Sequence, residues 1–204
     1  SVNVVSNPMR QYDLIIICSQ TKDHYKDLVS LKKYSDLLLL EKPAFPKYIG
    51  KTQLTKFLQN KNVIVSYPFT QAKLFSILQN IIKVSGTPNS VKVKCCSWLP
   101  NWRKDRELKG GYWNDNSQGG VVRELVHEIN YVRLFYGFPS SVDANFDFNL
   151  KNFGITVETS ANINFYYKSG LIVNLLLSMD SKEEERDRKS TRLNSSHANI
   201  SYAV

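Results

Sequence analysis

The segment "GGVVRELVHEIN", residues 119–130, combines an apolar helical repeat with side chains that could move a proton. Arg123, His127 and Asn130 stand at positions i, i+4 and i+7, and residues at this spacing share one stripe of a helix. A neutral imidazole can serve as general base for an alcohol proton near neutral pH. Glu124, about one turn before His127, could set the tautomer of the ring. The spacing alone equally fits a histidine that only hydrogen-bonds to a neighbour.

Two glycines, Gly119 and Gly120, lead into this helix. Because glycine has no Cβ, we expect them to let the start of the helix lie against a flat ligand. The helix is predicted to run from about residue 120 to 136 and to end at Gly137. Its buried stripe is predicted to comprise Val122, Leu125, Val126, Ile129 and Val132.

Polar residues also follow two short apolar runs near the N-terminus. The first run, 14–18, leads into "SQTKDH", in which Ser19, Gln20 and Thr21 could contact a nucleotide. In open α/β sheets, ligands bind beyond the carboxyl ends of the strands, and both runs are predicted strands. The alternative for this segment is an ordinary strand-to-helix turn in which Asp23 is the N-cap.

The second run, 37–40, is followed by "EKP", residues 41–43. Neither Glu41 nor Lys42 suits a strand core, and Pro43 fixes the turn that carries the lysine. A lysine held in this way could orient a substrate hydroxyl or stabilise an oxyanion. The alternative is a surface lysine beside a proline.

These candidate residues depend on an alternation of elements in the first third of the chain. Strands are predicted at 12–19, 35–43 and 63–68, and helices at 23–34 and 47–62. Strand–helix alternation of this kind is typical of a parallel, doubly wound α/β sheet.

The pattern changes after residue 68. A longer amphipathic helix is predicted at 69–86, and further strands at 90–99, 141–149, 155–167 and 171–179. In the strand 155–167 every second residue is apolar or Thr, from Ile155 to Phe165. This period predicts a largely antiparallel, open sheet with one face in water. We therefore expect two domains, 1–68 and 69–186.

Composition limits the class of protein. Hydrophobic residues make up 42% and charged residues 22% of the 204 residues, as in an ordinary soluble protein, and no apolar run approaches the roughly 20 residues needed to cross a bilayer. The net charge is +9, but the lysines are scattered, so a solvated surface is favoured over a nucleic-acid partner. Three cysteines are too few for a zinc site or a disulfide framework, which favours the cytoplasm and no metal.

The last segment of the chain differs in origin from the rest. "DRKSTRLNSSH", residues 187–197, matches codon for codon one reading frame of a common sequencing-library adaptor. We therefore expect 187–204 to be a non-native, adaptor-derived tail without fixed structure, and the natural sequence to end near Arg186.

Taken together, "DLIIICSQTKDHYKDLVSLKKYSDLLLLEKPAF", "VIVSYPFTQAKLFSIL" and "GGVVRELVHEINYVRLFYG" resemble the Gfo/Idh/MocA oxidoreductase family over about residues 12–180. The resemblance implies an α/β fold, with the C-terminal part of a Rossmann-like parallel sheet followed by an α+β domain. It also implies an NAD- or NADP-dependent dehydrogenase of a sugar, cyclitol or sugar acid, and a homodimer or homotetramer. The Gly-rich pyrophosphate loop is then expected upstream of Ser1, and the chain itself is expected to be inactive.

The same resemblance assigns roles to the candidate residues. Lys42 touches the nicotinamide ribose and the reacting hydroxyl, and His127, supported by Glu124, exchanges the hydroxyl proton. The cofactor is lined by Ser19, Gln20, Thr21, His24, Glu41 and Lys42, and the sugar pocket by Trp102, Tyr112, Arg123 and Asn130. Arg123 and Asn130 stand where the family often has aspartates. A sugar-sensing protein without chemistry is therefore kept as an alternative. NAD-assisted glycoside cleavage, a different reaction within the same family, is a second one.

Overall fold

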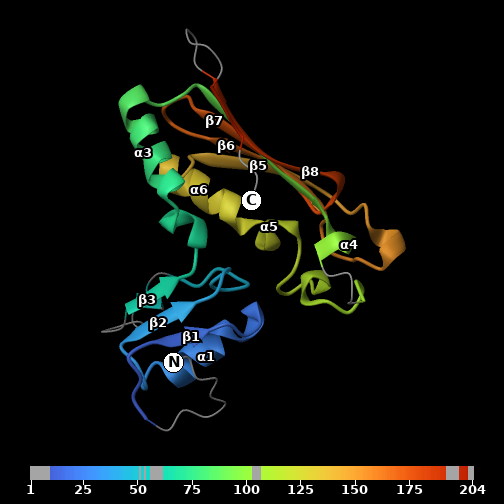
Figure 1. The fold of residues 1–204 in the computed structure, drawn as a ribbon. Coiled ribbons are helices and arrows are strands. Elements are labelled where there is room, and N and C mark those ends of the chain that lie inside the picture. The colour runs from blue at the N-terminus through green and yellow to red at the C-terminus, as the bar shows by residue number, and fades with distance from the viewer. Residues whose placement is uncertain are drawn as a thin grey trace. The chain divides into compact units, whose positions relative to one another are not determined.

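The computed structural model describes residues 10–50, 52, 54, 55, 62–102, 107–191 and 198–201. The chain divides into two compact units, Ser1–Tyr67 and Pro68–Val204, which are described one at a time (Figure 1). No helix within the described ranges is both long enough and apolar enough to cross a membrane.

The first unit contains a parallel sheet of three strands in the order β1 (Ile15–Ile17), β2 (Leu37–Leu40) and β3 (Asn62–Val65). A 3-10 turn, η1 (Thr21–Asp23), and helix α1 (His24–Leu31) connect β1 to β2. The predicted parallel α/β arrangement is therefore confirmed. Of the helix predicted at 47–62, residues 52, 54 and 55 are helical, whereas residues 47–50 are not and Asn62 begins β3; residues 51, 53 and 56–61 lie outside the described residues.

The core of the first unit lies on one face of this sheet. Ile17, Leu38 and Leu40 are almost fully buried there against Leu28 of α1. On the other face, Ile16 is 47% exposed and Ile64 is 54% exposed. Among the described residues α1 covers one face only, so this second face is more exposed than in a sheet covered on both sides.

The second unit begins with η2 (Pro68–Gln71) and α3 (Lys73–Ser85), which ends at Gly86 as predicted. It continues through β4 (Ser90–Trp98), α4 (Leu99–Trp102), η3 (Tyr112–Asn114), α5 (Val121–Glu124) and α6 (Val126–Tyr136). The remaining elements are β5 (Ser141–Asp147), η4 (Lys151–Phe153), β6 (Ser160–Tyr166), β7 (Ile172–Ser178), β8 (Asp180–Thr191) and β9 (Ala198–Ser201).

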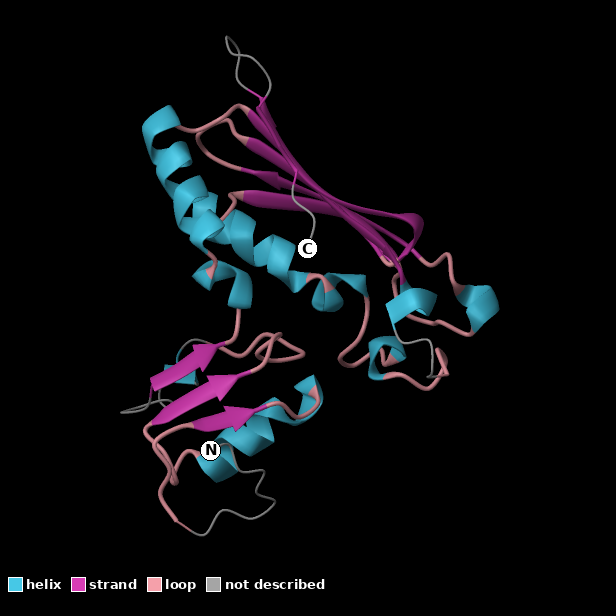
Figure 2. Ribbon diagram, viewed as in Figure 1, coloured by secondary structure: helices cyan, strands magenta, loops and turns pink. Residues whose placement is uncertain are grey.

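Six strands of this unit form one twisted sheet in the order β5-β6-β7-β4-β8-β9. All neighbours are antiparallel except β4 and β7, which confirms a largely antiparallel sheet. Helices α3, α5 and α6 lie on one side of it (Figure 2). The alternate residues from Ile155 to Phe165 are all buried, with Phe165 the most exposed at 8%. They share the core with Val121 and Val132 of the two short helices, so the predicted buried face is confirmed.

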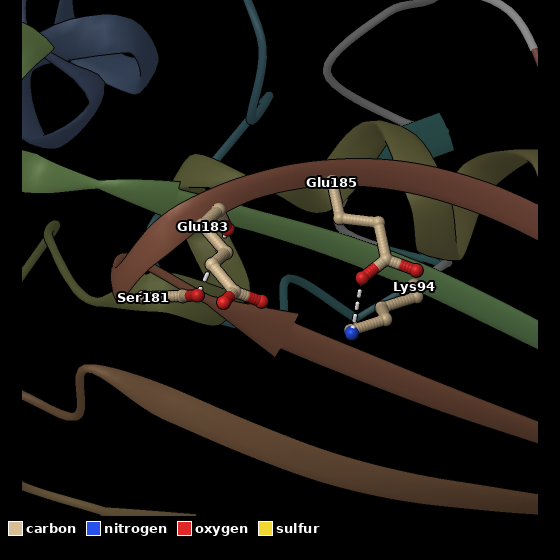
Figure 3. A network of polar contacts seen from close by, with 4 residues as sticks. All are labelled: Lys94, Ser181, Glu183 and Glu185. Atoms are coloured by element: carbon tan, nitrogen blue, oxygen red, sulfur yellow. Dashed lines mark hydrogen bonds and ion pairs between the residues drawn. The ribbon is translucent and has the colours of Figure 1, made fainter.

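The opposite face of the sheet is polar. The Asn174 amide nitrogen donates to the side-chain oxygens of Asn162, at 2.6 Å, and Asn164, at 2.8 Å. Further along this face, the Lys94 ammonium pairs with the Glu185 carboxylate, and this hydrogen bond raises the pKa of the lysine (Figure 3). Such cross-strand polar pairs suit a sheet face that meets water.

Strand β8 continues into the segment that was expected to lack structure. Residues 187–191 pair with 90–94 of β4, and Ala198–Ser201 pairs back onto β8. These residues of the segment expected to be an adaptor-derived tail are therefore strand, and the origin of the segment stays a prediction. The physical reason for the pairing is that β4 offers a row of backbone donors and acceptors, and backbone pairing depends little on the side chains of the added strand.

Candidate active site

Two groups of predicted site residues meet at the carboxyl edge of the parallel sheet in the first unit. The Glu41 N–H donates to the Ile17 carbonyl at 3.0 Å, so the ladder between β1 and β2 extends to the first residue of the EKP segment. Because β1 and β2 are parallel neighbours, the segment Ser19–Thr21 and Lys42 follow them at the same edge. This is the edge at which open α/β sheets bind ligands.

The polar groups of this edge differ in how far they are already engaged. The Ser19 hydroxyl, on an exposed residue, donates to the Asp27 carboxylate at 2.5 Å. Gln20 is exposed, whereas Thr21 is buried. The Lys42 N–H donates to the Glu41 carboxylate at 3.1 Å, and the Lys42 side chain is half-buried. Ser19 and Gln20 are thus the exposed polar residues after β1, and the half-buried Lys42 follows β2.

His24 occupies a different position from the one expected of a cofactor ligand. Its side chain is 1% exposed, at the first residue of α1. Nδ1 lies 3.1 Å from the carbonyl oxygens of both Pro43 and Ala44, and Nε2 lies 3.0 Å from the Ser19 carbonyl. Both ring nitrogens thus face backbone acceptors. This arrangement argues for a role within the protein in place of direct contact with a cofactor.

The helix that carries His127 is interrupted. Leu125 has φ −98° and ψ 26°, so α5 ends at Glu124 and α6 begins at Val126. The prediction of one continuous helix over 120–136 is wrong. The stripe of Arg123, His127 and Asn130 is broken with it, because the spacing from residue 123 to 127 crosses the irregular turn.

The predicted apolar stripe of this helix is also wrong in part. Only Val132 among its five members is fully buried, while Val122, Leu125 and Ile129 pack on the core from partly exposed positions. The fully buried residues of α6 include two polar ones, Glu128 at 1% and Asn130 at 9% exposed.

The two glycines before α5 make room for the protein itself. A Cβ on Gly119 would lie 2.1 Å from the carbonyl oxygen of Trp113, and one on Gly120 would lie 2.1 Å from the Glu158 carboxylate. Gly120 also has φ +97°, a conformation that side chains with a Cβ rarely adopt. The expectation that the glycines serve the approach of a flat ligand is replaced by this internal packing.

His127 lies among aromatic rings at the start of α6. The Phe69 ring meets the imidazole edge-on, with centroids 5.4 Å apart, and meets Tyr131 in the same manner at 6.0 Å. Nδ1 of His127 is buried. The hydrocarbon ring of Phe69 thus shields one side of the imidazole.

A buried ion pair lies behind this cluster, and sequence reasoning missed it. The Arg186 guanidinium donates to the Glu128 carboxylate from Nε at 3.0 Å and from Nη2 at 2.5 Å. Its Cζ lies 4.6 Å from the centroid of the Phe69 ring, as in a cation–π contact. Burial lowers the pKa of Arg186, but the nearby Glu128 carboxylate more than compensates and leaves the pKa above its ordinary value. The spacing of the sequence could have indicated that Glu128 is buried, because position 128 lies three residues after Leu125 and four before Val132, on the predicted apolar side of the helix.

The other predicted site residues are placed as follows. The Arg123 guanidinium donates to the Gly119 carbonyl at 2.7 Å, and the Tyr112 hydroxyl donates weakly to the Glu124 carboxylate at 3.4 Å. Trp102 packs on the core of the second unit. The Asn130 side-chain nitrogen is buried and makes no hydrogen bond within the described ranges. Tyr112 and Glu124 are thus brought together, while Trp102 and Asn130 are directed toward the core.

Among the residues that the structure describes, no group of three or more His, Cys, Asp or Glu side chains is placed to hold a metal ion.

Known structures share this fold. The chain matches myo-inositol 2-dehydrogenase from Lactobacillus plantarum with a TM-score of 0.76 at 13% identity, over 94% of this chain and 58% of that one. It matches UDP-N-acetylglucosamine 3-dehydrogenase GnnA from Acidithiobacillus ferrooxidans with a TM-score of 0.70 at 15% identity, over 93% and 57%. It matches the WlbA dehydrogenase from Bordetella pertussis, in complex with NADH and UDP-GlcNAcA, with a TM-score of 0.73 at 12% identity, over 88% and 56%.

At these identities the likeness shows the fold alone, and the chain spans between half and three fifths of each of these proteins. No curated protein sequence matches the chain. The family model of the GFO/IDH/MocA C-terminal domain matches residues 83–200, which is more than half of the chain. The chain therefore belongs to the GFO/IDH/MocA family.

Proposed function

We propose that this chain is part of an oxidoreductase that transfers hydride between NAD or NADP and a sugar, cyclitol or sugar acid. The observation that carries the proposal is the position of Lys42 at the carboxyl end of β2, beside the loop 19–21 that ends β1. Structures of the same fold include dehydrogenases of myo-inositol and of a nucleotide sugar, and the WlbA dehydrogenase structure contains NADH. Family membership and these neighbours support the class of reaction.

The residues at this edge fit the nicotinamide end of such a cofactor. The Ser19 hydroxyl, the Gln20 amide and the Lys42 ammonium suit the hydroxyls of a ribose and a carboxamide, and all three follow adjacent parallel strands. The chain contains no G-x-G-x-x-G sequence, so it offers no glycine loop of this kind for the pyrophosphate. When bound, the nicotinamide supplies the acceptor or donor of the hydride.

In this proposal Lys42 and His127 take the roles that the family resemblance assigns to them. The Lys42 ammonium hydrogen-bonds to the reacting hydroxyl oxygen and stabilises the negative charge that develops there. The His127 imidazole accepts the hydroxyl proton as hydride leaves the carbon that bears this hydroxyl, and returns the proton in the reverse reaction. Glu124, with its contact from Tyr112, supports the imidazolium that forms. Phe69 limits the access of water to one side of the ring.

The test uses the full-length enzyme that contains this chain. His127→Ala is expected to lower turnover by at least about a hundredfold, since a general base contributes 10²- to 10⁴-fold, and to leave NADH binding unchanged by calorimetry. Lys42→Ala is expected to lower turnover as well. The matched control is Arg133→Ala, an exposed position of α6, which is expected to keep full activity.

The outcomes separate the alternatives. Turnover retained in His127→Ala removes this residue from the mechanism. Sugar binding without hydride transfer to or from either cofactor indicates a sensing protein. A tightly held cofactor with no net release of NADH during glycoside cleavage indicates the hydrolytic alternative. The 204-residue chain alone is expected to show no measurable turnover.

A further inference from the structure

The imidazole of His24 joins two loops that the sheet itself does not join. The ladder between the β1 and β2 segments reaches the bond from the Glu41 N–H to the Ile17 carbonyl. Beyond this point, the His24 ring reaches Ser19 on one side and Pro43 and Ala44 on the other. We propose that His24 is a positioning residue that fixes the turn carrying Lys42. This inference rests on the proposed role of Lys42.

The chemistry of the contacts shows why a histidine suits this position. All three partners are backbone carbonyl oxygens, which only accept hydrogen bonds, and the two ring nitrogens point in different directions. A ring with a proton on both nitrogens donates to both backbone segments at once, whereas a neutral ring donates to the segment that faces its one N–H. The 1% exposure of the ring keeps water from competing. Buried carbonyls left without a donor destabilise the fold, so losing the ring should loosen both segments.

The geometry also separates positioning from ordinary core packing. Leu28, one turn later on α1, is fully buried among the apolar residues of the same unit. A role in packing alone predicts that removing either side chain loosens the unit in the same way. A positioning role predicts a selective effect on residues 18–20 and 41–46, next to the contacted carbonyls.

The experiment is hydrogen–deuterium exchange on the full 204-residue chain, read segment by segment. His24→Phe, which keeps a ring but has no donor, is expected to raise exchange of the Glu41 and Lys42 amides by about tenfold relative to the strand amides of β2. Leu28→Ala is the matched control, and it is expected to raise exchange throughout the first unit without favouring these two amides.

Two conservative variants keep the inference open to refutation if His24→Phe does not fold. His24→Asn places an amide nitrogen near the position of Nδ1, and His24→Gln places one near the position of Nε2. The asparagine is expected to restore protection at 41–46, and the glutamine to restore it at 18–20. Equal exchange in these two variants, or equal loosening by His24→Phe and Leu28→Ala, would overturn the positioning role.

This result is independent of the proposed reaction. If Lys42→Ala keeps full turnover in the full-length enzyme, the catalytic role of Lys42 fails while the exchange pattern stands. If Lys42 is required and the exchange pattern is uniform, the positioning role of His24 fails alone. In the full-length enzyme, a positioning role also predicts that His24→Asn keeps more of kcat than His24→Gln, because it retains the bonds on the Lys42 side.

Discussion

Substitution of Gly119 by alanine tests the packing that sets the start of α5. An added Cβ would lie 2.1 Å from the Trp113 carbonyl oxygen and 2.4 Å from its carbon, against roughly 3.5–4.0 Å for an ordinary carbon contact. This carbonyl is backbone and also accepts the Gly120 N–H at 3.0 Å. The alanine can therefore be accommodated only if η3 and the start of α5 move apart.

The size of the effect follows from these contacts. Overpacking of this kind costs about 1–3 kcal/mol, and the loss of the hydrogen bond to Trp113 adds about 1 kcal/mol. We expect Gly119→Ala to lower the free energy of unfolding of the second unit by about 3 kcal/mol. The matched control is Gly110→Ala, because a Cβ there meets nothing within 4 Å. It should leave stability unchanged or raise it by about 0.4–1 kcal/mol.

The assay is urea unfolding followed by tryptophan fluorescence. The three tryptophans of the chain all lie after residue 67, so their emission reports on the second unit. Equal urea midpoints for Gly119→Ala and Gly110→Ala would refute the argument from packing. The glycine pair would then need another explanation, and the approach of a flat ligand to this helix start would be the first to consider.

Two further predictions use the same unfolding assay. Arg186→Ala leaves the buried Glu128 carboxylate without its main partner and is expected to lower the free energy of unfolding by about 3 kcal/mol. Adding Glu128→Gln should recover part of this loss. A double variant that loses as much stability as the two single variants together would contradict this coupling. Burial raises the pKa of the Cys96 thiol above its ordinary value of 9.0. The neutral thiol therefore stabilises the fold below pH 9.0, and this contribution is lost as the pH rises beyond it. The urea midpoint should therefore fall as the pH rises beyond 9.0, and fall less in Cys96→Ala; identical curves for both proteins would exclude this cause.

Local alternation in the sequence was enough to predict the buried face of the large sheet. In β6, Ala161, Ile163 and Phe165 are buried because successive side chains of a strand point to opposite sides and only one side meets the helices. Ile155, Val157 and Thr159 are buried too, although they precede the strand. The strands of the first unit were predicted for a similar reason, since short apolar runs bounded by polar turns suit a parallel sheet. These features depend on near neighbours in the chain.

The features that the sequence did not predict depend on distant partners. Glu128 interrupts an apolar stripe, and its burial makes sense only with Arg186, 58 residues later in the chain. The role of Gly119 depends on the Trp113 carbonyl, and that of Gly120 on the Glu158 carboxylate. No proline or glycine stands at the break at Leu125, so no helix-breaking residue predicts it. The period of a helix carries no information about which charged residue will find a buried partner.

The two buried polar residues of α6 bear on how His127 is presented. On a helix, adjacent residues project about 100° apart, so a side chain fixed at one position determines where its neighbour points. Glu128 is tied to Arg186 on the core side, and the same guanidinium packs on the ring of Phe69, which in turn meets the His127 imidazole. The ion pair thus fixes both the rotation of α6 about its axis and the position of the Phe69 ring beside His127. For the proposed base this means that Glu128 helps to determine where the imidazole lies through Arg186 and Phe69. Replacing Glu128 with an apolar residue would remove the constraint on the helix rotation and on the Phe69 ring together.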